Sequence, residues 1–245
     1  MEFLKRQPSP APSLDGIAPP DIASRIIIET SARARRLGLR VEPARDCVVL
    51  VRPRRASNTA VTAFVAAHMS WICDHLKALP ARVPFANGAV IPFQGVDHVL
   101  KARPQERGGV WREEGCIIVT GQPEHMGRRV TDWLKTEARS NLATLVNAMA
   151  ATVGREVNRI TVRDTRSRWG SCAQGGRLSF SWRLILAPPF VLRYVAAHET
   201  AHLLHANHGP AFKRATSDLL KPYGEDPALA RAWLGRHGAG LHRYG

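Results

Sequence analysis

The sequence has few cysteines and no long apolar run. Its four cysteines stand far apart and form no Cys-x-x-Cys pair: Cys47, Cys73, Cys116 and Cys172. This spacing argues against a disulfide framework and against a thiolate zinc site. The first 20 residues, MEFLKRQPSPAPSLDGIAPP, lack the apolar stretch of a secretory signal, and no apolar run is long enough to span a bilayer. We therefore expect a cytoplasmic protein with reduced thiols and no membrane contact.

Acidic side chains are also scarce. The 20 Asp and Glu residues face 35 Lys and Arg residues, so the formal net charge is +15. Such a charge attracts polyanions and favours non-specific contact with nucleic acid. The excess of arginine over lysine, together with abundant alanine, also arises from a bias in base composition. The charge therefore leaves a nucleic-acid partner open and does not bear on the fold.

Three segments of the chain differ in composition. Residues 1–20 are rich in Pro, Ser and Ala and are predicted to be a disordered tail. Residues 21–123 are predicted to form a β-rich N-terminal unit with one helix, and residues 124–245 a second unit with long helices and two strands. The length of 245 residues and the hydrophobic content of 44% suit one large domain or two small ones. We predict an α+β fold.

The pattern of residues 21–123 predicts short strands around one helix. About three β-branched strands end near Pro53, and Asn58 is placed to cap a helix that runs to about residue 79. His68 and His75 fall in that helix, where we expect them to be surface or hydrogen-bonded core residues. Gly-containing turns predict two further hairpins over 88–104 and 109–121.

The pattern of residues 124–245 predicts a long amphipathic helix that Gly154 stops. Two strands follow, NRITVRD and GRLSFSWRLILA, and the alternation of the second continues to Leu186. Pro188-Pro189 ends this strand. It is predicted to be either a core strand or an edge against which an extended peptide pairs.

The helix after Pro189 carries the pattern H-E-x-x-H, formed by His198, Glu199 and His202. Residues four apart lie on one helix face, so the two imidazoles can bind one ion. Glu199 lies about 100° around the helix and is placed to reach a water on that ion. A helix that carries histidines by chance is the alternative interpretation.

His208 is the candidate for a third ligand. It precedes Gly209-Pro210, which we expect to stop the helix, and Asn207 tolerates the left-handed conformation that a return of the chain needs. His205 and Glu225 are weaker alternatives. Three imidazoles would leave a fourth zinc position for a water with a pKa near ~7, and Glu199 would accept its proton during attack on a peptide carbonyl.

Several motifs in order resemble the YgjP-like metallopeptidases, relatives of the WLM and SprT-like zincins. They are RWGSC at 168–172, WRL at 182–184, His198-Glu199 with His202, and Asn207-His208 with Phe212. The resemblance covers residues from about 25 to 235. It implies a small zincin-like domain with a backing helix, in which His198, His202 and His208 bind zinc and Glu199 is the general base. Thr200 and His205 depart from the family pattern without removing a ligand.

Alternative functions use the same site. One is a DNA-associated protease of the WLM or SprT type, and another is a metal-dependent nucleotide phosphoanhydride hydrolase, although the sequence has no Gly-x-x-x-x-Gly-Lys loop. Cys172 is a weak candidate nucleophile, and Tyr194 and Tyr223 are weak candidates for stabilising an oxyanion. An intact Glu199 argues against a purely structural zinc module. Neither the cleavage preference nor the oligomeric state follows from the sequence.

Overall fold

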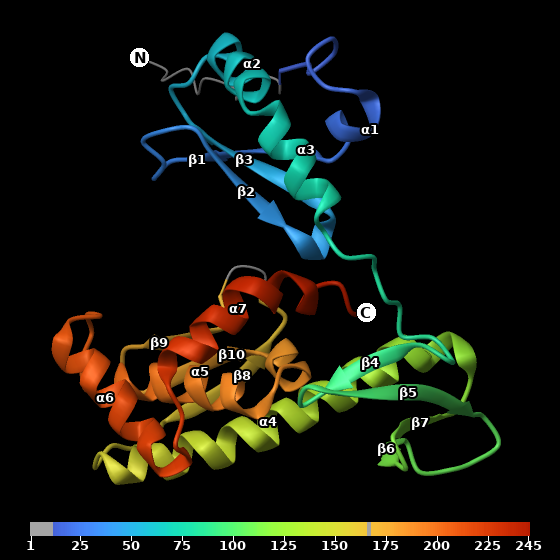
Figure 1. Cartoon of the computed structure of the whole chain (residues 1–245), viewed down its shortest axis with the longest axis vertical. Coiled ribbons are helices and arrows are strands. Elements are labelled where there is room, and N and C mark those ends of the chain that lie inside the picture. Colours follow the sequence, from blue (N-terminus) through green and yellow to red (C-terminus); the bar gives the residue numbers. More distant parts are fainter. Residues whose placement is uncertain (1–11, 166–167) are drawn as a thin grey trace, which may run out of the picture. The chain divides into compact units, whose positions relative to one another are not determined.

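The computed structural model describes residues 12–165 and 168–245, and the chain divides into two compact units after Leu79 (Figure 1). More than half of the predicted tail, residues 1–11, lies outside the described residues. From residue 12 onward the segment belongs to the first unit, because Leu14 is buried in its core and helix α1 begins at Pro20 (Pro20–Ala23).

The first unit is a three-stranded sheet with two helices on it. Its strands are β1 (Ile26–Ser31), β2 (Gly38–Glu42) and β3 (Cys47–Pro53), which confirms the three predicted strands. The order is β1-β3-β2, with β1 parallel and β2 antiparallel to the central strand β3. Buried side chains of β3, such as Val48 and Leu50, share a core with the helices that follow.

The helix predicted from Asn58 onward is interrupted. It forms α2 (Asn58–Ala67) and α3 (Met69–Lys77), and the backbone leaves the helical region at His68, where φ is −112°. The cap is Ser57 and not Asn58, because the Ser57 hydroxyl accepts a hydrogen bond from the Ala60 N–H at 3.1 Å. His68 and His75 each place Nδ1 2.8 Å from a carbonyl oxygen of the preceding turn, as expected for histidines without a ligand role.

The second unit opens with a four-stranded sheet. Its strands are β4 (Val90–Phe93), β5 (Val96–Arg103), β6 (Val110–Glu113) and β7 (Cys116–Thr120), in the order β4-β5-β7-β6. The pairs β4–β5 and β6–β7 are antiparallel, which confirms both predicted hairpins. Helix α4 (Met126–Thr152) follows and is succeeded by Gly154 in the left-handed region, φ +62°, as predicted.

One hydrophobic core contains residues of this sheet, of helix α4 and of the later strands and helices. The core contains Ile91, Leu100 and Ile117 from the sheet, a stripe of α4 from Met126 to Met149, and most of the later helices. Trp133 of α4 stacks on Phe93 with ring centroids 5.2 Å apart. The compact units therefore separate at 79/80, whereas composition placed the division at 123/124, because residues 80–123 bury their apolar face against α4.

The second sheet differs from its prediction. It consists of β8 (Arg159–Arg163), β9 (Gly170–Ala173) and β10 (Arg177–Ser181), in the order β8-β10-β9. The predicted strand through residue 187 ends at Ser181, and residues 182–186 form a 3-10 helix, η3 (Trp182–Leu186), whose residues are all buried. Strand β10 is central, so the first of the two predicted alternatives, a core strand, is confirmed, and the second, an edge strand, is wrong. The outer strands are β8 and β9, and β9 overlaps the RWGSC segment.

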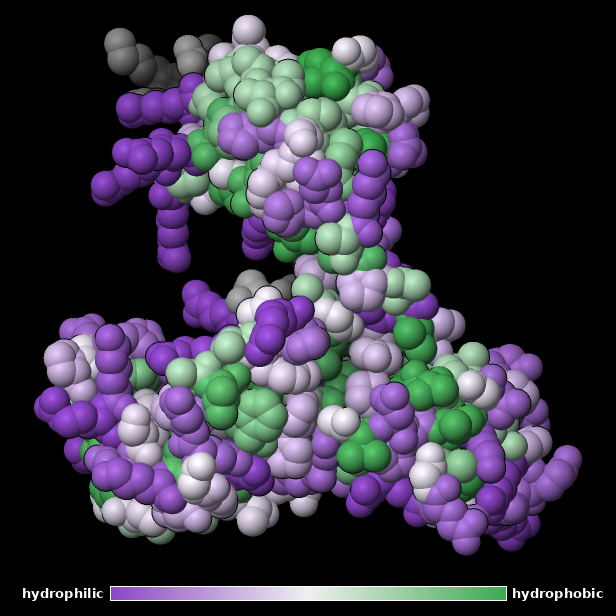
Figure 2. All heavy atoms as spheres, in the orientation of Figure 1, coloured by the Kyte–Doolittle hydropathy of each residue, from purple (hydrophilic) through white to green (hydrophobic). Residues whose placement is uncertain are grey.

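Three helices complete the unit. They are α5 (Pro189–Ala201), α6 (Pro210–Leu220) and α7 (Pro227–Leu241), and α5 packs against α4, α6, α7 and β9. Hydrophilic side chains are spread over the visible face of both units (Figure 2). In the described ranges, no helix combines the length and apolarity needed to cross a bilayer. The α+β class is confirmed, and the cytoplasmic location stays a prediction.

Candidate metal centre

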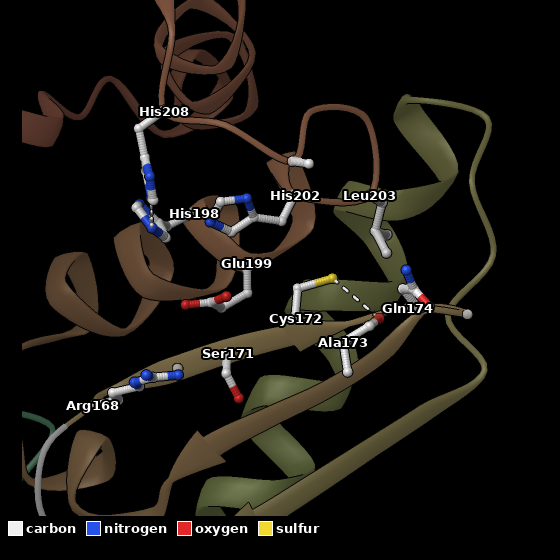
Figure 3. Close-up of a pocket in the computed structure, with 14 residues that line it drawn as sticks. Arg168, Ser171, Cys172, Ala173, Gln174, His198, Glu199, His202, Leu203 and His208 are labelled. Carbon is white, nitrogen blue, oxygen red and sulfur yellow. Dashed lines mark hydrogen bonds between the residues drawn. The ribbon is translucent and has the colours of Figure 1, made fainter. Parts of the chain in front are cut away.

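Helix α5 places two histidines at the floor of a cleft. Pro189 occupies its first turn, where the missing N–H costs nothing, and the helix is buried on nearly all sides. His198 and His202 are four residues apart, so their rings stand on one face with centroids 5.1 Å apart. The cleft has a volume of about 510 Å³ and is bounded on its other side by β9 (Figure 3).

The third histidine comes from the connection between α5 and α6. The helix ends at His202, earlier than predicted, and Gly209-Pro210 begin α6 instead of ending α5. Asn207 does not adopt the left-handed conformation that we expected. Turns directly after α5 are closed by backbone hydrogen bonds such as Leu203 N–H to Thr200 O, 2.9 Å. This short return still brings His208 over α5.

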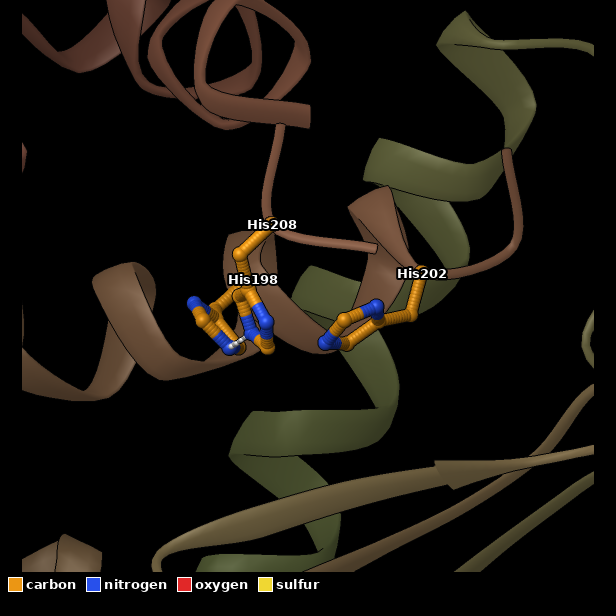
Figure 4. A group of neighbouring side chains, drawn as sticks. All are labelled: His198, His202 and His208. Carbon is orange, nitrogen blue, oxygen red and sulfur yellow. Dashed lines mark hydrogen bonds between the residues drawn. The ribbon is translucent and has the colours of Figure 1, made fainter. Parts of the chain in front are cut away.

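The three imidazoles converge. One ring nitrogen from each of His198, His202 and His208 lies within 4.8 Å of the others, and the Nε2 atoms of His198 and His208 are 3.2 Å apart (Figure 4). Burial lowers the pKa of His198 to about 4, and the neighbouring His202 and His208 add to this shift. A neutral imidazole keeps the lone pair that a metal needs, so the donor set fits a divalent ion.

Two contacts orient the rings. The Nδ1 atom of His202 lies 3.0 Å from the carbonyl oxygen of His205, which leaves Nε2 to face the cluster. Phe212 is buried beneath the three imidazoles, with ring centroids 4.5 to 4.9 Å from theirs. Phe212 belongs to a motif noted in the sequence, but its role as a support for all three rings was not predicted.

The alternative third ligands lie elsewhere. The backbone carbonyl of His205 is the hydrogen-bond partner of His202 Nδ1. The His205 side chain is not part of the histidine group that the described residues form. Glu225 is held by Arg193, whose Nε lies 2.8 Å from Oε1. Neither side chain is brought to the imidazoles.

Glu199 points into the same cleft beside strand β9 (Figure 3). Its side chain lies so close to the backbone of β9 that a Cβ on Gly170 would be 2.5 Å from Oε1. Glycine, which has no side chain, is the residue that leaves room for this close approach. Burial raises the pKa of the Glu199 carboxyl to about 7, and the Arg168 guanidinium partly opposes this rise. A carboxyl in this range exchanges protons readily at neutral pH.

Trp169 and Cys172, two other residues of RWGSC, lie in different surroundings. Trp169 lies against α7, where a Cβ on Gly238 would be 3.1 Å from its ring. Cys172 faces the cleft. Burial raises the pKa of its thiol, and the Glu199 carboxylate raises it further, so the environment disfavours the thiolate that a nucleophile requires.

The two tyrosines are separated by the fold. Tyr194 lies one turn before His198, with ring centroids 5.9 Å apart, and burial raises the pKa of its hydroxyl. Tyr223 instead lies against Arg193, 5.2 Å from its ring centroid. Arg231 of α7 borders the cavity that contains Tyr194 and His198. No spacing in the sequence pointed to Arg231, because it reaches the site only through the packing of α7 on α5.

The fold and site together define the class of protein. A small α+β domain, with a long helix behind an H-E-x-x-H helix and a third imidazole on the following turn, is a zincin-like metallopeptidase domain. The chain belongs to the YgjP-like family, because the family model YgjP-like, metallopeptidase domain, matches residues 35–237. Neither the curated proteins nor the solved structures gave a match. Membership implies a peptidase that uses a divalent metal and acts on protein or peptide.

Proposed function

We propose that the protein is a zinc-dependent peptidase in which His198, His202 and His208 hold the metal. The convergence of three imidazoles with a buried carboxylate in one cleft carries this proposal. Imidazole suits zinc, and three protein ligands leave a position open, as catalytic sites require. When bound, zinc supplies Lewis acidity that brings the pKa of water near ~7 and polarises a peptide carbonyl.

Glu199 acts as the general base. Its carboxylate faces the cleft that the imidazoles border, so it takes a proton from the attacking water and passes it to the departing amine. Arg168 favours the charged form of Glu199, which burial alone would disfavour. Tyr194 is the better of the two tyrosine candidates for stabilising the oxyanion, because it lies beside His198 and its raised pKa keeps the hydroxyl protonated as a donor.

Strand β9 is the surface on which an extended substrate pairs. It borders the cleft and, within the described ranges, pairs with β10 alone, so its second edge has backbone groups for another strand. A peptide laid there gains main-chain hydrogen bonds that do not depend on its side chains. The peptide-pairing edge, one of two alternatives that the sequence offered for β10, is therefore proposed for β9 instead.

Metal content of purified variants tests the ligand set. Wild type, His205→Ala and Glu199→Gln are expected to retain near-stoichiometric zinc, whereas His208→Ala loses it. His205→Ala is a matched control because the same residue type is removed from the same connection, while the carbonyl that bonds His202 remains. Loss of zinc from His205→Ala with retention in His208→Ala would overturn the assignment.

Turnover of a fluorogenic peptide library tests the reaction. Glu199→Gln is expected to lose peptide hydrolysis while keeping zinc. The same preparations are then given nucleoside triphosphates, because hydrolysis of these with no peptide cleavage would replace the proposal by the phosphoanhydride alternative.

Backbone-methylated peptides test the role of β9. Methylation of successive N–H groups in a cleaved peptide is expected to impair turnover at alternate positions, because only every second residue bonds to a given neighbouring strand. Equal tolerance at all positions would rule out strand pairing.

A further inference from the structure

The first unit carries an unneutralised arginine surface that the peptidase site does not use. Five arginines form it, and all are exposed: Arg33, Arg35, Arg36, Arg54 and Arg55. The first three lie in the β1–β2 connection, and the other two directly follow β3. We call these five residues the arginine surface.

The topology forces the two segments together. Strands β1 and β3 are parallel neighbours and end at the same level, with Ser31 paired to Pro53. Because β3 lies between β1 and β2, residues 32–37 must cross the end of β3, where Arg54 and Arg55 emerge. Hydrophilic side chains project from this end of the first unit (Figure 2).

Hydrogen bonds between side chains and backbone groups hold both segments in place. The buried Arg52 donates to the Ala56 carbonyl oxygen at 2.7 and 3.1 Å, which closes the turn that carries Arg54 and Arg55. The Ser31 hydroxyl accepts from the N–H groups of Arg33 and Ala34 at 3.3 Å. The cations are therefore presented by ordered turns.

Acidic side chains of this unit form salt bridges with arginines that lie outside the arginine surface. Arg25 pairs with Asp46 at 3.0 Å, and Arg40 pairs with Glu29 at 2.8 Å. Arg45 pairs with Glu29 as well. In the part of the chain that the structure describes, none of the five guanidinium groups of the arginine surface has an ion pair.

The start of α2 adds positive potential beside this surface. The helix begins at Asn58, three residues after Arg55, and its first N–H groups carry the positive end of the helix dipole. Guanidinium forks bind phosphate oxygens in pairs, so arginines grouped with a helix N-terminus form a site for several phosphates at once.

We propose that the arginine surface binds the phosphate backbone of double-stranded DNA. Single-strand binding relies on aromatic stacking, and residues 31–37 and 52–60 contain no aromatic side chain. Membrane docking relies on exposed apolar side chains, and no large exposed one lies in residues 12–79. The binding is sequence-independent and lies in a different unit from the histidine cluster, so it does not depend on the proposed peptidase chemistry.

The test measures fluorescence anisotropy of a labelled 20-base-pair DNA duplex with the full chain, at 50 to 300 mM salt. One variant replaces the five surface arginines by Gln. A control variant removes the same charge from five exposed arginines of the second unit: Arg107, Arg139, Arg155, Arg214 and Arg236. Thermal melting and peptide turnover are expected to match wild type in the surface variant.

The surface variant is expected to lose affinity by at least about 30-fold, and the slope of its plot of log K against log salt should flatten by about 4.5, because each of the five lost phosphate contacts removes roughly 0.9 from the slope. The control variant should keep most of the slope. Equal losses in both variants, or no DNA binding by wild type at 50 mM salt, would overturn the proposal. Tighter binding to duplex RNA, or binding only to vesicles containing phosphatidylserine, would also overturn it.

Discussion

Gly170 of strand β9 and the Glu199 side chain of helix α5 lie directly against each other beside the cleft. A Cβ at position 170 would lie 2.5 Å from Oε1, 2.6 Å from Cγ and 2.8 Å from Cδ of Glu199. Non-bonded carbon and oxygen atoms do not approach so closely, so a side chain at 170 would displace either the carboxylate or strand β9. The glycine of RWGSC thereby sets the position of the Glu199 carboxylate, the proposed general base.

Gly170→Ala is expected to lower peptide turnover by about 100-fold, the cost of a displacement of roughly 1 Å in a catalytic group. Zinc content should be unchanged, because the three atoms nearest to that Cβ all belong to Glu199 and none to an imidazole. Gly235→Ala is the control, since its Cβ would meet no atom within 4 Å and it lies in helix α7. The control should retain activity. Full activity in Gly170→Ala would show that Glu199 is not held there.

Removal of metal is expected to lower the stability of the second unit. An ion bound only by the folded state adds about 2.7 kcal/mol at a free concentration 100 times its Kd. Thermal melting with a chelator, and again after zinc is restored, measures this effect. His208→Ala should melt at the same temperature in both conditions. An equal response of the variant and wild type to zinc would place the ion elsewhere.

Cys172→Ala is expected to keep nearly full peptide turnover, far from the loss of about 10⁶ that follows removal of a nucleophile in a hydrolase. The physical reason is the raised pKa of the thiol, which burial and the nearby Glu199 carboxylate both cause. Alkylation of Cys172 by iodoacetamide, followed by mass spectrometry, should be slow at pH 7 and accelerate above pH 9. Rapid alkylation at neutral pH with loss of turnover in the variant would restore the thiol as a candidate.

Arg183→Met is expected to destabilise the protein by about 3 kcal/mol, because it leaves buried acceptors without a donor. The Arg183 side chain is 7% exposed and donates to Asp164 at 3.1 Å, to the Leu241 carbonyl at 3.1 Å and to the Tyr244 carbonyl. Chemical denaturation gives the free energy of unfolding. Arg177→Met, an exposed change in the preceding strand, should stay within about 0.5 kcal/mol of wild type.

Local chemistry made part of the site predictable from the sequence. His198, Glu199 and His202 stand within one turn of one helix, so their spacing alone places them together. His208 follows six residues after His202, and any tight return of the chain keeps it near. The path of the chain between His202 and His208 was mispredicted. Asn207 and Gly209 were expected to end the helix, whereas the helix is already capped at His202.

Long-range packing hid the rest of the site. Strand β9 has no alternation over its four residues, and it is recognisable only through its pairing with β10. Residues 182–186 alternate as a strand does, yet all of them are buried, and Arg183 reaches the C-terminal residues 241 and 244. Arg231 comes to the site through tertiary packing alone. Such contacts between distant segments produce no periodic pattern of residues in the sequence.

The continuity of α4 restricts how this peptidase domain can be exchanged between proteins. One helix carries the apolar stripe that covers the sheet of residues 90–120 and also supports α5. A recombination joint near residue 124, where the composition shifts, would therefore divide a single core and leave both products with uncovered apolar faces. A joint at residue 80 keeps that core whole, so transplanting the catalytic machinery into another chain requires residues 80–245 as one indivisible segment.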